Sequence, residues 1–180
     1  MKKIEKIIWQ KAREISLLLL DVDGVLTDGG ILYDGKGKEL KRFFVQDGQG
    51  LRWLQKSGIE IGLLSGRSSK AVAQRAEELG IALVYQGQSN KIKVFERLIK
   101  KLDLLPNQVG FMGDDFIDLP LLKKVGLSIC VGNGHLLVQK EVDYVTHSAG
   151  GYGAVREVCE LILQAQGKWD PILREYGLRV

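Results

Sequence analysis

A run of four leucines, Leu17 to Leu20, leads directly into the sequence Asp21-Val22-Asp23-Gly24. A short apolar run that ends at a glycine turn is typical of a strand buried on both faces, as in the middle of a parallel sheet. Residues two apart on an extended backbone point to the same side, so both carboxylates would lie just beyond this strand. Since ligand sites of open α/β sheets lie at the carboxyl ends of the strands, we expect a cation-binding or nucleophilic site there.

Strand and helix patterns alternate along nearly the whole chain, with short connections. We expect helices near residues 3–14, 47–56, 69–79, 90–102 and 152–166, and strands near 17–20, 59–64, 81–85, 109–113, 127–131 and 142–145. The alternation predicts an α/β fold of the doubly wound (Rossmann-like) kind, with a parallel sheet covered by helices on both faces. We expect a single domain over residues 1–180.

Residues 29–46 interrupt this alternation with two strand-like pieces, around Gly30–Tyr33 and Lys41–Val45. The turn signal Asp34-Gly35 between them predicts a β-hairpin. Asp47 would be the N-cap of the helix that follows. The tail, residues 167–180, has no apolar pattern of helical length.

The composition excludes several classes of protein. No apolar run approaches the roughly 20 residues that span a membrane, and Met1–Lys6 lacks the apolar core of a signal peptide, so we expect a cytoplasmic protein without a membrane partner. Basic residues exceed acidic ones only by 26 to 22 and alternate with glutamates, as in Lys91–Lys101. We therefore expect no nucleic-acid partner, since that would need a clustered basic face. Cys130 and Cys159 are expected to be buried free thiols.

Three further polar clusters follow predicted strands or open predicted helices. They are Ser65-Gly66-Arg67, Lys91, and the acidic group Asp114, Asp115 and Asp118. Each has a plain structural alternative, because Ser65 and Asp114 could cap helices and a lone lysine usually lies on a solvated helix face. Parallel strands bring their carboxyl ends to one edge, so a single shared site explains all of the clusters better than four coincidences.

The motifs D-V-D-G-V-L-T (21–27), L-L-S-G-R (63–67), Lys91 and G-D-D-F-I-D (113–118) resemble the four motifs of the haloacid dehalogenase superfamily, in its phosphatase branch. The resemblance implies a phosphatase in which Asp21 attacks phosphorus to form an aspartyl-phosphate. Asp23 would protonate the leaving oxygen and then deprotonate the attacking water. Ser65, Gly66 and Lys91 would bind the transferring phosphoryl group.

The same resemblance implies a Mg²⁺ cofactor, with Mn²⁺ or Co²⁺ as substitutes, since oxygen donors suit these ions. Asp21, the backbone carbonyl of Asp23, and Asp114 would hold the metal. Asp115 and Asp118 would not contact the metal but would orient its ligands or waters.

Four stretches resemble one capless family across the full chain, the 3-deoxy-D-manno-octulosonate 8-phosphate phosphatases. They are G-V-L-T-D-G (24–29), F-x-V-x-D-G (43–48), G-D-D-x-I-D (113–118) and A-G-G-x-G-A-V-R-E-V (149–158). The implied reaction is hydrolysis of that ester to the free sugar acid and inorganic phosphate, a step of lipopolysaccharide biosynthesis. Arg67 and Arg75, placed on one helix, would bind the substrate's anionic groups bidentately. The full set of implied substrate contacts is Phe44, Val45, Gln46, Asp47, Gly48, Arg52, Gly66, Arg67, Arg75 and Lys91.

The chain has no room for a large cap, either between Asp23 and Ser65 or between Ser65 and Lys91. The hairpin has strand edges and apolar residues that favour pairing with other copies: Ile31, Leu32, Tyr33, Phe43 and Phe44. We expect a homo-oligomer, a tetramer assembled through the hairpin, with active sites between subunits. The alternative is a hairpin that covers its own site. The tail from Trp169, which carries Arg174 and Arg179, either folds over a neighbouring site or frays.

Three other functions compete with this one. A phosphatase for a related nine-carbon sugar acid 9-phosphate would use the same chemistry. A catalytically silent oligomeric binding subunit could use the same fold. A nucleic-acid binder would need basic clustering and aromatic stacking motifs that the chain lacks.

Overall fold

The structure is a computed structural model that describes residues 4–178. Its sheet has six strands: β1 (Leu17–Leu20), β4 (Glu60–Leu64), β5 (Leu83–Tyr85), β6 (Val109–Gly113), β7 (Leu127–Cys130) and β8 (Tyr144–Val145). They are all parallel, in the order β5-β4-β1-β6-β7-β8. The chain builds outward from β1 in one direction and from β6 in the other, so the topological switch point lies between these two strands. The predicted doubly wound fold is confirmed.

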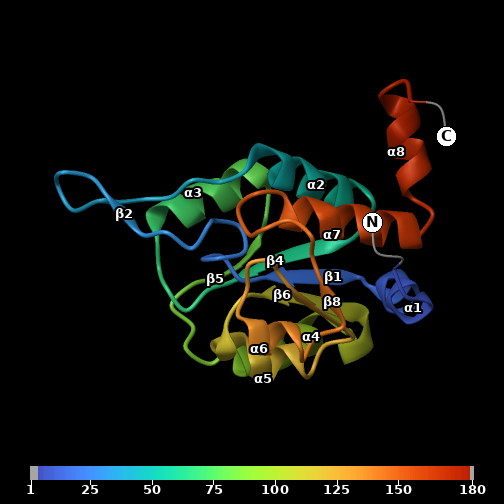
Figure 1. Ribbon diagram of the computed structural model, residues 1–180, viewed down its shortest axis with the longest axis horizontal. Coiled ribbons are helices and arrows are strands. Elements are labelled where there is room, and N and C mark those ends of the chain that lie inside the picture. The colour runs from blue at the N-terminus through green and yellow to red at the C-terminus, as the bar shows by residue number, and fades with distance from the viewer. Residues whose placement is uncertain (1–3, 179–180) are drawn as a thin grey trace.

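Helices cover both faces of this sheet (Figure 1). On one face lie α2 (Val45–Lys56), α3 (Lys70–Leu79) and α7 (Ala154–Ala165), and on the other α4 (Lys91–Leu102), α5 (Leu119–Leu122) and α6 (Leu136–Gln139). The remaining helices are α1 (Lys6–Glu14), α8 (Trp169–Glu175) and the short 3₁₀ turns η1 (Pro106–Gln108) and η2 (Phe116–Asp118). The predicted first helix thus begins at Lys6, and Lys3 lies outside the described residues.

The four leucines of β1 supply both halves of the core. Leu18 and Leu20 pack with α2, α3 and α7, whereas Leu17 and Leu19 pack with α4 and α5. All four are at most 1% exposed. Both neighbouring strands pair with β1 in register, Leu20 opposite Leu63 of β4 and Met112 of β6. The prediction of a strand buried on both faces is confirmed.

The hairpin projects past the carboxyl end of the sheet, at the opposite end of the molecule from α1 and α8 (Figure 1). Its strands are β2 (Leu32–Tyr33) and β3 (Glu39–Leu40), and the Asp34 carboxylate accepts the N–H groups of Lys36 and Lys38 in the turn. The second strand was predicted at Lys41–Val45, which is wrong, because the paired segment ends at Leu40 and Val45 begins α2.

Asp47 was predicted to cap α2, and this is also wrong. The N-cap of α2 is Phe44, and Asp47 lies inside the helix with its side chain buried. Its Oδ1 accepts the backbone N–H of Arg156, in the first turn of α7. Asp47 therefore caps a helix distant in sequence, and burial raises the pKa of its carboxyl to about 6.

The tail contains a helix that its apolar pattern did not predict. Trp169 of α8 packs edge-on against Trp53 of α2 with ring centroids 5.4 Å apart, and Ile172 is buried. The helix forms because it packs against α2 in its own subunit, a contact that local periodicity does not reveal. Arg174 is exposed on α8, and Arg179 lies outside the described residues.

Two simpler observations complete the fold. Cys130 and Cys159 are buried free thiols, as predicted. None of the helices within residues 4–178 is both long and apolar enough to cross a membrane.

Candidate active site

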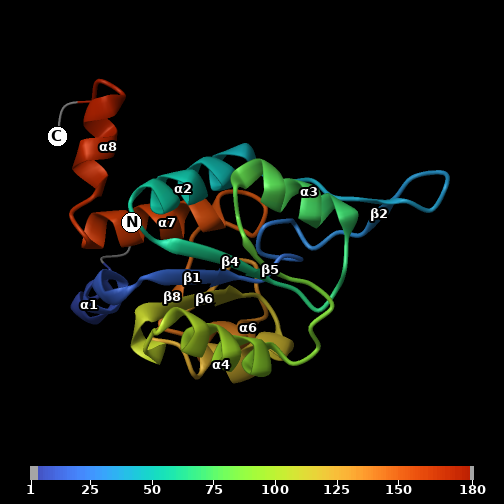
Figure 2. The same cartoon turned by 180° about the vertical axis from the view of Figure 1, so that it is seen from behind.

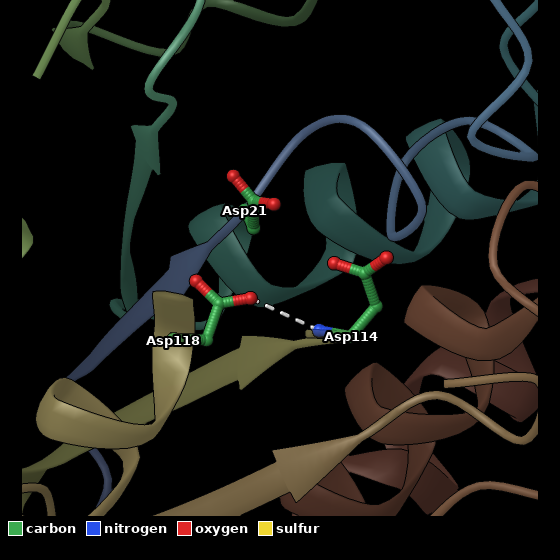
Figure 3. A group of neighbouring side chains, drawn as sticks. All are labelled: Asp21, Asp114 and Asp118. Carbon is green, nitrogen blue, oxygen red and sulfur yellow. Dashed lines mark hydrogen bonds between the residues drawn. The ribbon is translucent and has the colours of Figure 1, made fainter. Parts of the chain in front are cut away.

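Three carboxylates from two segments of the chain meet at the switch point of the sheet. Asp21 follows β1, Asp114 follows β6, and Asp118 ends the turn η2 (Figure 3). One carboxylate oxygen of each lies within 4.8 Å of the other two. The Asp21 N–H donates to the carbonyl of Met112 at 2.9 Å, which extends the β1–β6 pairing up to Asp21. The predicted convergence of these acids is confirmed.

Lys91 provides the positive charge within this group. It is the first residue of α4, and its buried Nζ lies 2.7 Å from Asp21 Oδ1 and 2.6 Å from Asp118 Oδ1. Burial alone would lower the pKa of this ammonium, but the two carboxylates outweigh burial and raise it. Lys91 is therefore a fixed cation beside Asp21, not a solvated helix residue.

Asp118 holds the loop after β6 in place. Its side chain is fully buried, and Oδ2 accepts the Asp114 N–H at 3.0 Å (Figure 3). Asp115 is exposed, and its carboxylate accepts the N–H of Phe116 at 2.7 Å. Asp118 thus orients Asp114 and Lys91, whereas Asp115 closes its own turn.

Gly24 lets the loop after β1 approach Asp114 closely. Its φ is +90°, and a Cβ at this position would come 2.1 Å from Asp114 Oδ2. Any side chain here would both strain the backbone and displace that carboxylate. The glycine of the D-x-D-G motif is therefore required by the site itself.

Burial and crowding raise the pKa values of two of these acids. Burial is the main cause for both: it raises the pKa of Asp21 to about 6, against the opposing effect of Lys91, and that of Asp114 to about 7. The neighbouring Asp21 and Asp118 carboxylates raise the Asp114 value further. Three carboxylates facing one ammonium leave excess negative charge, which suits a hard divalent cation with oxygen ligands.

We expect the metal-free protein to lose stability as pH rises from about 5 to about 7.5, by about 4 kcal/mol from Asp21 and Asp114 together. The raised pKa values mean that the folded chain binds protons more tightly than the unfolded chain, so ionisation in this interval costs folding free energy. Saturating Mg²⁺ should remove most of the decline, because the cation favours the ionised carboxylates. Urea unfolding with a chelator and with Mg²⁺ measures both effects. A metal-free unfolding free energy that increases over this interval would contradict the assignment.

Asp23 lies apart from the three clustered acids and is paired with two cations. Its Oδ1 forms an ion pair with Lys41 Nζ, and its Oδ2 lies 3.8 Å from Arg67 Nε. Glu39 bonds the same two cations, at 2.8 Å from Lys41 and 2.7 Å from Arg67. Our reading of the sequence missed Glu39 and Lys41. The signal available was their i, i+2 spacing next to a hairpin strand, which places two opposite charges on one side of an extended chain.

Ser65 directly follows β4 and is buried. Its N–H donates to the Tyr85 carbonyl, and its Oγ accepts the Arg67 N–H at 3.1 Å. Gly66 is exposed, and a Cβ there would meet no atom within 4 Å. Arg67 was expected to share a helix with Arg75, but α3 begins at Lys70, so Arg67 lies on the preceding loop. This places its guanidinium next to Asp23.

The other predicted substrate contacts lie on α2 and α3. Arg75 lines a cavity of about 160 Å³ together with Lys41 and Phe43. Gly48 leaves room for that arginine, because a Cβ there would come 2.3 Å from Arg75 Nη2. Arg52 donates to the carbonyl of Glu78 at 2.9 Å and so ties α2 to α3. Phe44 is half-buried, whereas Val45 and Gln46 are exposed.

Sequence and structure comparisons relate this chain to a known group of enzymes. Residues 81–158 match the haloacid dehalogenase-like hydrolases. The 3-deoxy-D-manno-octulosonate 8-phosphate phosphatase of Salmonella typhi is 52% identical over 163 residues, which cover 91% of this chain and 87% of the relative. The corresponding enzyme of Yersinia pestis is 48% identical over 161 residues.

Two solved structures carry ligands that bear on the site. The phosphatase of Moraxella catarrhalis, in complex with magnesium ion, phosphate ion and a KDO molecule, has a TM-score of 0.92 and 46% identity, covering 94% of this chain and 97% of that one. The cobalt-bound phosphatase of Haemophilus influenzae has a TM-score of 0.86 and 40% identity, covering 89% of this chain and 94% of that one.

Proposed function

Because this chain belongs to the 3-deoxy-D-manno-octulosonate 8-phosphate phosphatases, a family of haloacid dehalogenase-like hydrolases, we propose that its clustered aspartates and Lys91 hydrolyse that sugar acid phosphate. The chain is a phosphoric monoester hydrolase. The observation that carries the assignment of residues is the contact of Lys91 with Asp21 at 2.7 Å, with the Asp114 carboxylate in the same cluster. In this proposal Asp21 is the nucleophile, Lys91 is a fixed cation beside it, and Asp114 is a metal-binding carboxylate.

In the first step, an Asp21 carboxylate oxygen attacks phosphorus, and the bond between phosphorus and the sugar oxygen breaks. Asp23 gives its proton to that leaving oxygen, so the free sugar acid departs as a neutral alcohol. The ammonium of Lys91 offsets negative charge on Asp21 and on the phosphoryl oxygens. The product on the enzyme is an aspartyl-phosphate.

In the second step, Asp23 is a carboxylate and accepts a proton from water as that water attacks the aspartyl-phosphate. The phosphorus–oxygen bond to Asp21 breaks, inorganic phosphate leaves, and Asp23 regains its proton. The Ser65 hydroxyl and the backbone N–H of Gly66 hold phosphoryl oxygens through both steps.

Asp21, the backbone carbonyl of Asp23, and Asp114 would hold Mg²⁺. When bound, this ion neutralises phosphate charge and completes the electrostatic balance of the three acids. Asp118 keeps Asp114 and Lys91 in place through its hydrogen bonds, and Asp115 shapes the loop beside them. The magnesium and cobalt ions of the related structures support this choice of cofactor.

Recognition of the sugar acid falls to the segment Phe44–Gly48 and to the arginines around it. Arg67 lies beside Asp23, where the leaving oxygen departs, and Arg75 lines the neighbouring cavity. Both offer bidentate bonds to a carboxylate or phosphate. Arg52 can contact substrate only if its hydrogen bond to the Glu78 carbonyl breaks first.

The experiment that tests this function is phosphate release from a panel of phosphorylated sugar acids with Mg²⁺. We expect 3-deoxy-D-manno-octulosonate 8-phosphate to have the highest kcat/KM of the panel. Faster hydrolysis of a nine-carbon sugar acid 9-phosphate would overturn the choice of substrate. Binding without any phosphate release would identify a silent binding subunit instead.

We also propose that the enzyme is a homotetramer assembled through the hairpin, and that it acts in the cytoplasm in lipopolysaccharide biosynthesis. The hairpin exposes a group of large apolar side chains: Ile31, Leu32, Tyr33 and Leu40. It also presents unpaired strand edges, which favour pairing with other copies.

Replacing Leu32, which is 57% exposed, with glutamate should dissociate the assembly, because a charge would be buried at the pairing surface. Light scattering coupled to size-exclusion chromatography measures the mass of wild type and variant. As a matched control, Leu105 is 63% exposed on the connection before η1, and Leu105→Glu should leave the mass unchanged. A wild-type protein that runs as a monomer would contradict the proposed assembly.

A further inference from the structure

A second lysine lies between two acids, in the same way that Lys91 lies between Asp21 and Asp118. Lys91 bridges Asp21 and Asp118, and Lys41 bridges Asp23 and Glu39 in the same manner. The Lys41 side chain is only 1% exposed although it comes from the base of a projecting hairpin. A charged side chain so well shielded from water is held by its partners.

These contacts close into a ring of alternating charge. Glu39 Oε1 lies 2.8 Å from Lys41, and Glu39 Oε2 accepts Arg67 Nη2 at 2.7 Å. Arg67 Nε lies 3.8 Å from the second oxygen of Asp23, which returns the ring to its start. Two acids and two cations leave no net charge. The ring joins the loop after β1, the hairpin and the loop after β4.

The ring bears on the chemistry because Asp23 needs an exact orientation to exchange protons. A general acid must come within about 2.6–3.2 Å of the atom it protonates. Asp23 lies on the loop after β1, next to Gly24, and its side chain is 21% exposed. Lys41 is the closest partner of its carboxylate, and Glu39 keeps the ammonium anchored while Asp23 turns toward the leaving oxygen.

We propose that Lys41 is a positioning residue for Asp23: anchored on Glu39, it holds the Asp23 carboxyl group facing the leaving oxygen of the substrate. The proposal rests on the proposed phosphatase function. It differs from direct substrate binding by Lys41, in which the ammonium would contact the sugar acid. It differs also from a structural role, in which Lys41 would only fasten the hairpin.

A double-mutant cycle with Asp23→Asn separates these roles. We expect Lys41→Met to lower kcat on the sugar acid phosphate by about 10–100-fold with little change in KM, since misplacing a catalytic group has losses of this size. In the Asp23→Asn background the same change should have no further effect on kcat, because the group that Lys41 positions is already disabled. Losses that multiply, or a higher KM at unchanged kcat, would overturn the proposal.

The leaving group gives an independent readout. p-Nitrophenyl phosphate releases a phenolate that needs no proton, so Lys41→Met should slow the first step, measured as the pre-steady-state burst of p-nitrophenol, less than about threefold. With the sugar acid phosphate, rapid quenching measures the same step, and an equal loss of the first-step rate on both substrates would indicate a structural role and overturn the proposal. Lys36→Met, at the exposed hairpin turn, serves as the matched control and should turn over both substrates at the wild-type rate.

Two further measurements keep the outcome decisive. If thermal unfolding shows that Lys41→Met does not fold, Glu39→Gln replaces it in the same cycle, because it removes the anchor and leaves the lysine. Wild-type turnover of the sugar acid phosphate is measured first, since its absence would refute the proposed function and not the role of Lys41. If the wild type turns over normally and the losses in kcat from the two substitutions multiply, only the role of Lys41 is refuted.

Discussion

Asp21→Asn is expected to abolish phosphate release, lowering kcat by at least about 10⁴-fold, the scale of loss when a catalytic nucleophile is removed. An amide oxygen is too weak a nucleophile to attack phosphorus, and the substitution also removes a negative ligand of the metal. The shape of the side chain is retained, so the core around Leu20 and Val22 should not be disturbed. Steady-state phosphate release with saturating Mg²⁺ measures the loss.

Asp170→Asn is the matched control, because Asp170 is an exposed carboxylate on α8, at the end of the molecule opposite the hairpin. It should retain wild-type kcat. Thermal unfolding of both variants confirms that they are folded. Mg²⁺-dependent phosphate release that survives Asp21→Asn would refute Asp21 as the nucleophile.

Lys91→Met is expected to have the second-largest effect, on both activity and folding. It would leave the buried carboxylates of Asp21 and Asp118 without their cation. Breaking a buried ion pair on one side costs about 3–5 kcal/mol. We expect kcat to fall by about 10²–10³-fold, the scale found when one stabilising donor is removed from a transition state.

Chemical denaturation of the metal-free proteins measures the stability loss. The loss should be smaller at low pH, where Asp21 takes up a proton and no longer needs the ammonium. Lys93→Met, on an exposed position of the same helix, is the control. It should change neither kcat nor the free energy of unfolding by much. A Lys91→Met protein with wild-type stability and activity would show that the ammonium does not hold the two acids.

The parts of the fold that depend on local pattern were predictable. The leucine run determines β1 because only a central strand buries every residue, and Gly80 ends α3 in the left-handed conformation expected of a helix-terminal glycine. The charged side chains of the site were predictable for the same reason. Asp21, Lys91 and Asp114 each come at a strand end or a helix start, and parallel strands bring those ends together.

What could not be predicted depends on partners distant in sequence. Asp47 resembles a cap for its own helix, yet it caps α7, and α8 forms because Trp169 packs on Trp53. The ion pairs of Lys41 have the same cause. Lys41 and Asp23 are neighbours only because the hairpin folds back over the loop after β1, and no local pattern marks that contact.

The most direct test of the central claim is rapid acid quenching of the enzyme during turnover of 3-deoxy-D-manno-octulosonate 8-phosphate, followed by mass spectrometry of the peptide that contains Asp21. We predict one phosphoryl group on the Asp21 carboxylate, formed only with a divalent cation and absent from Asp21→Asn. Turnover at full rate with no phosphorylated peptide, or with the phosphoryl group on another residue, would contradict the account.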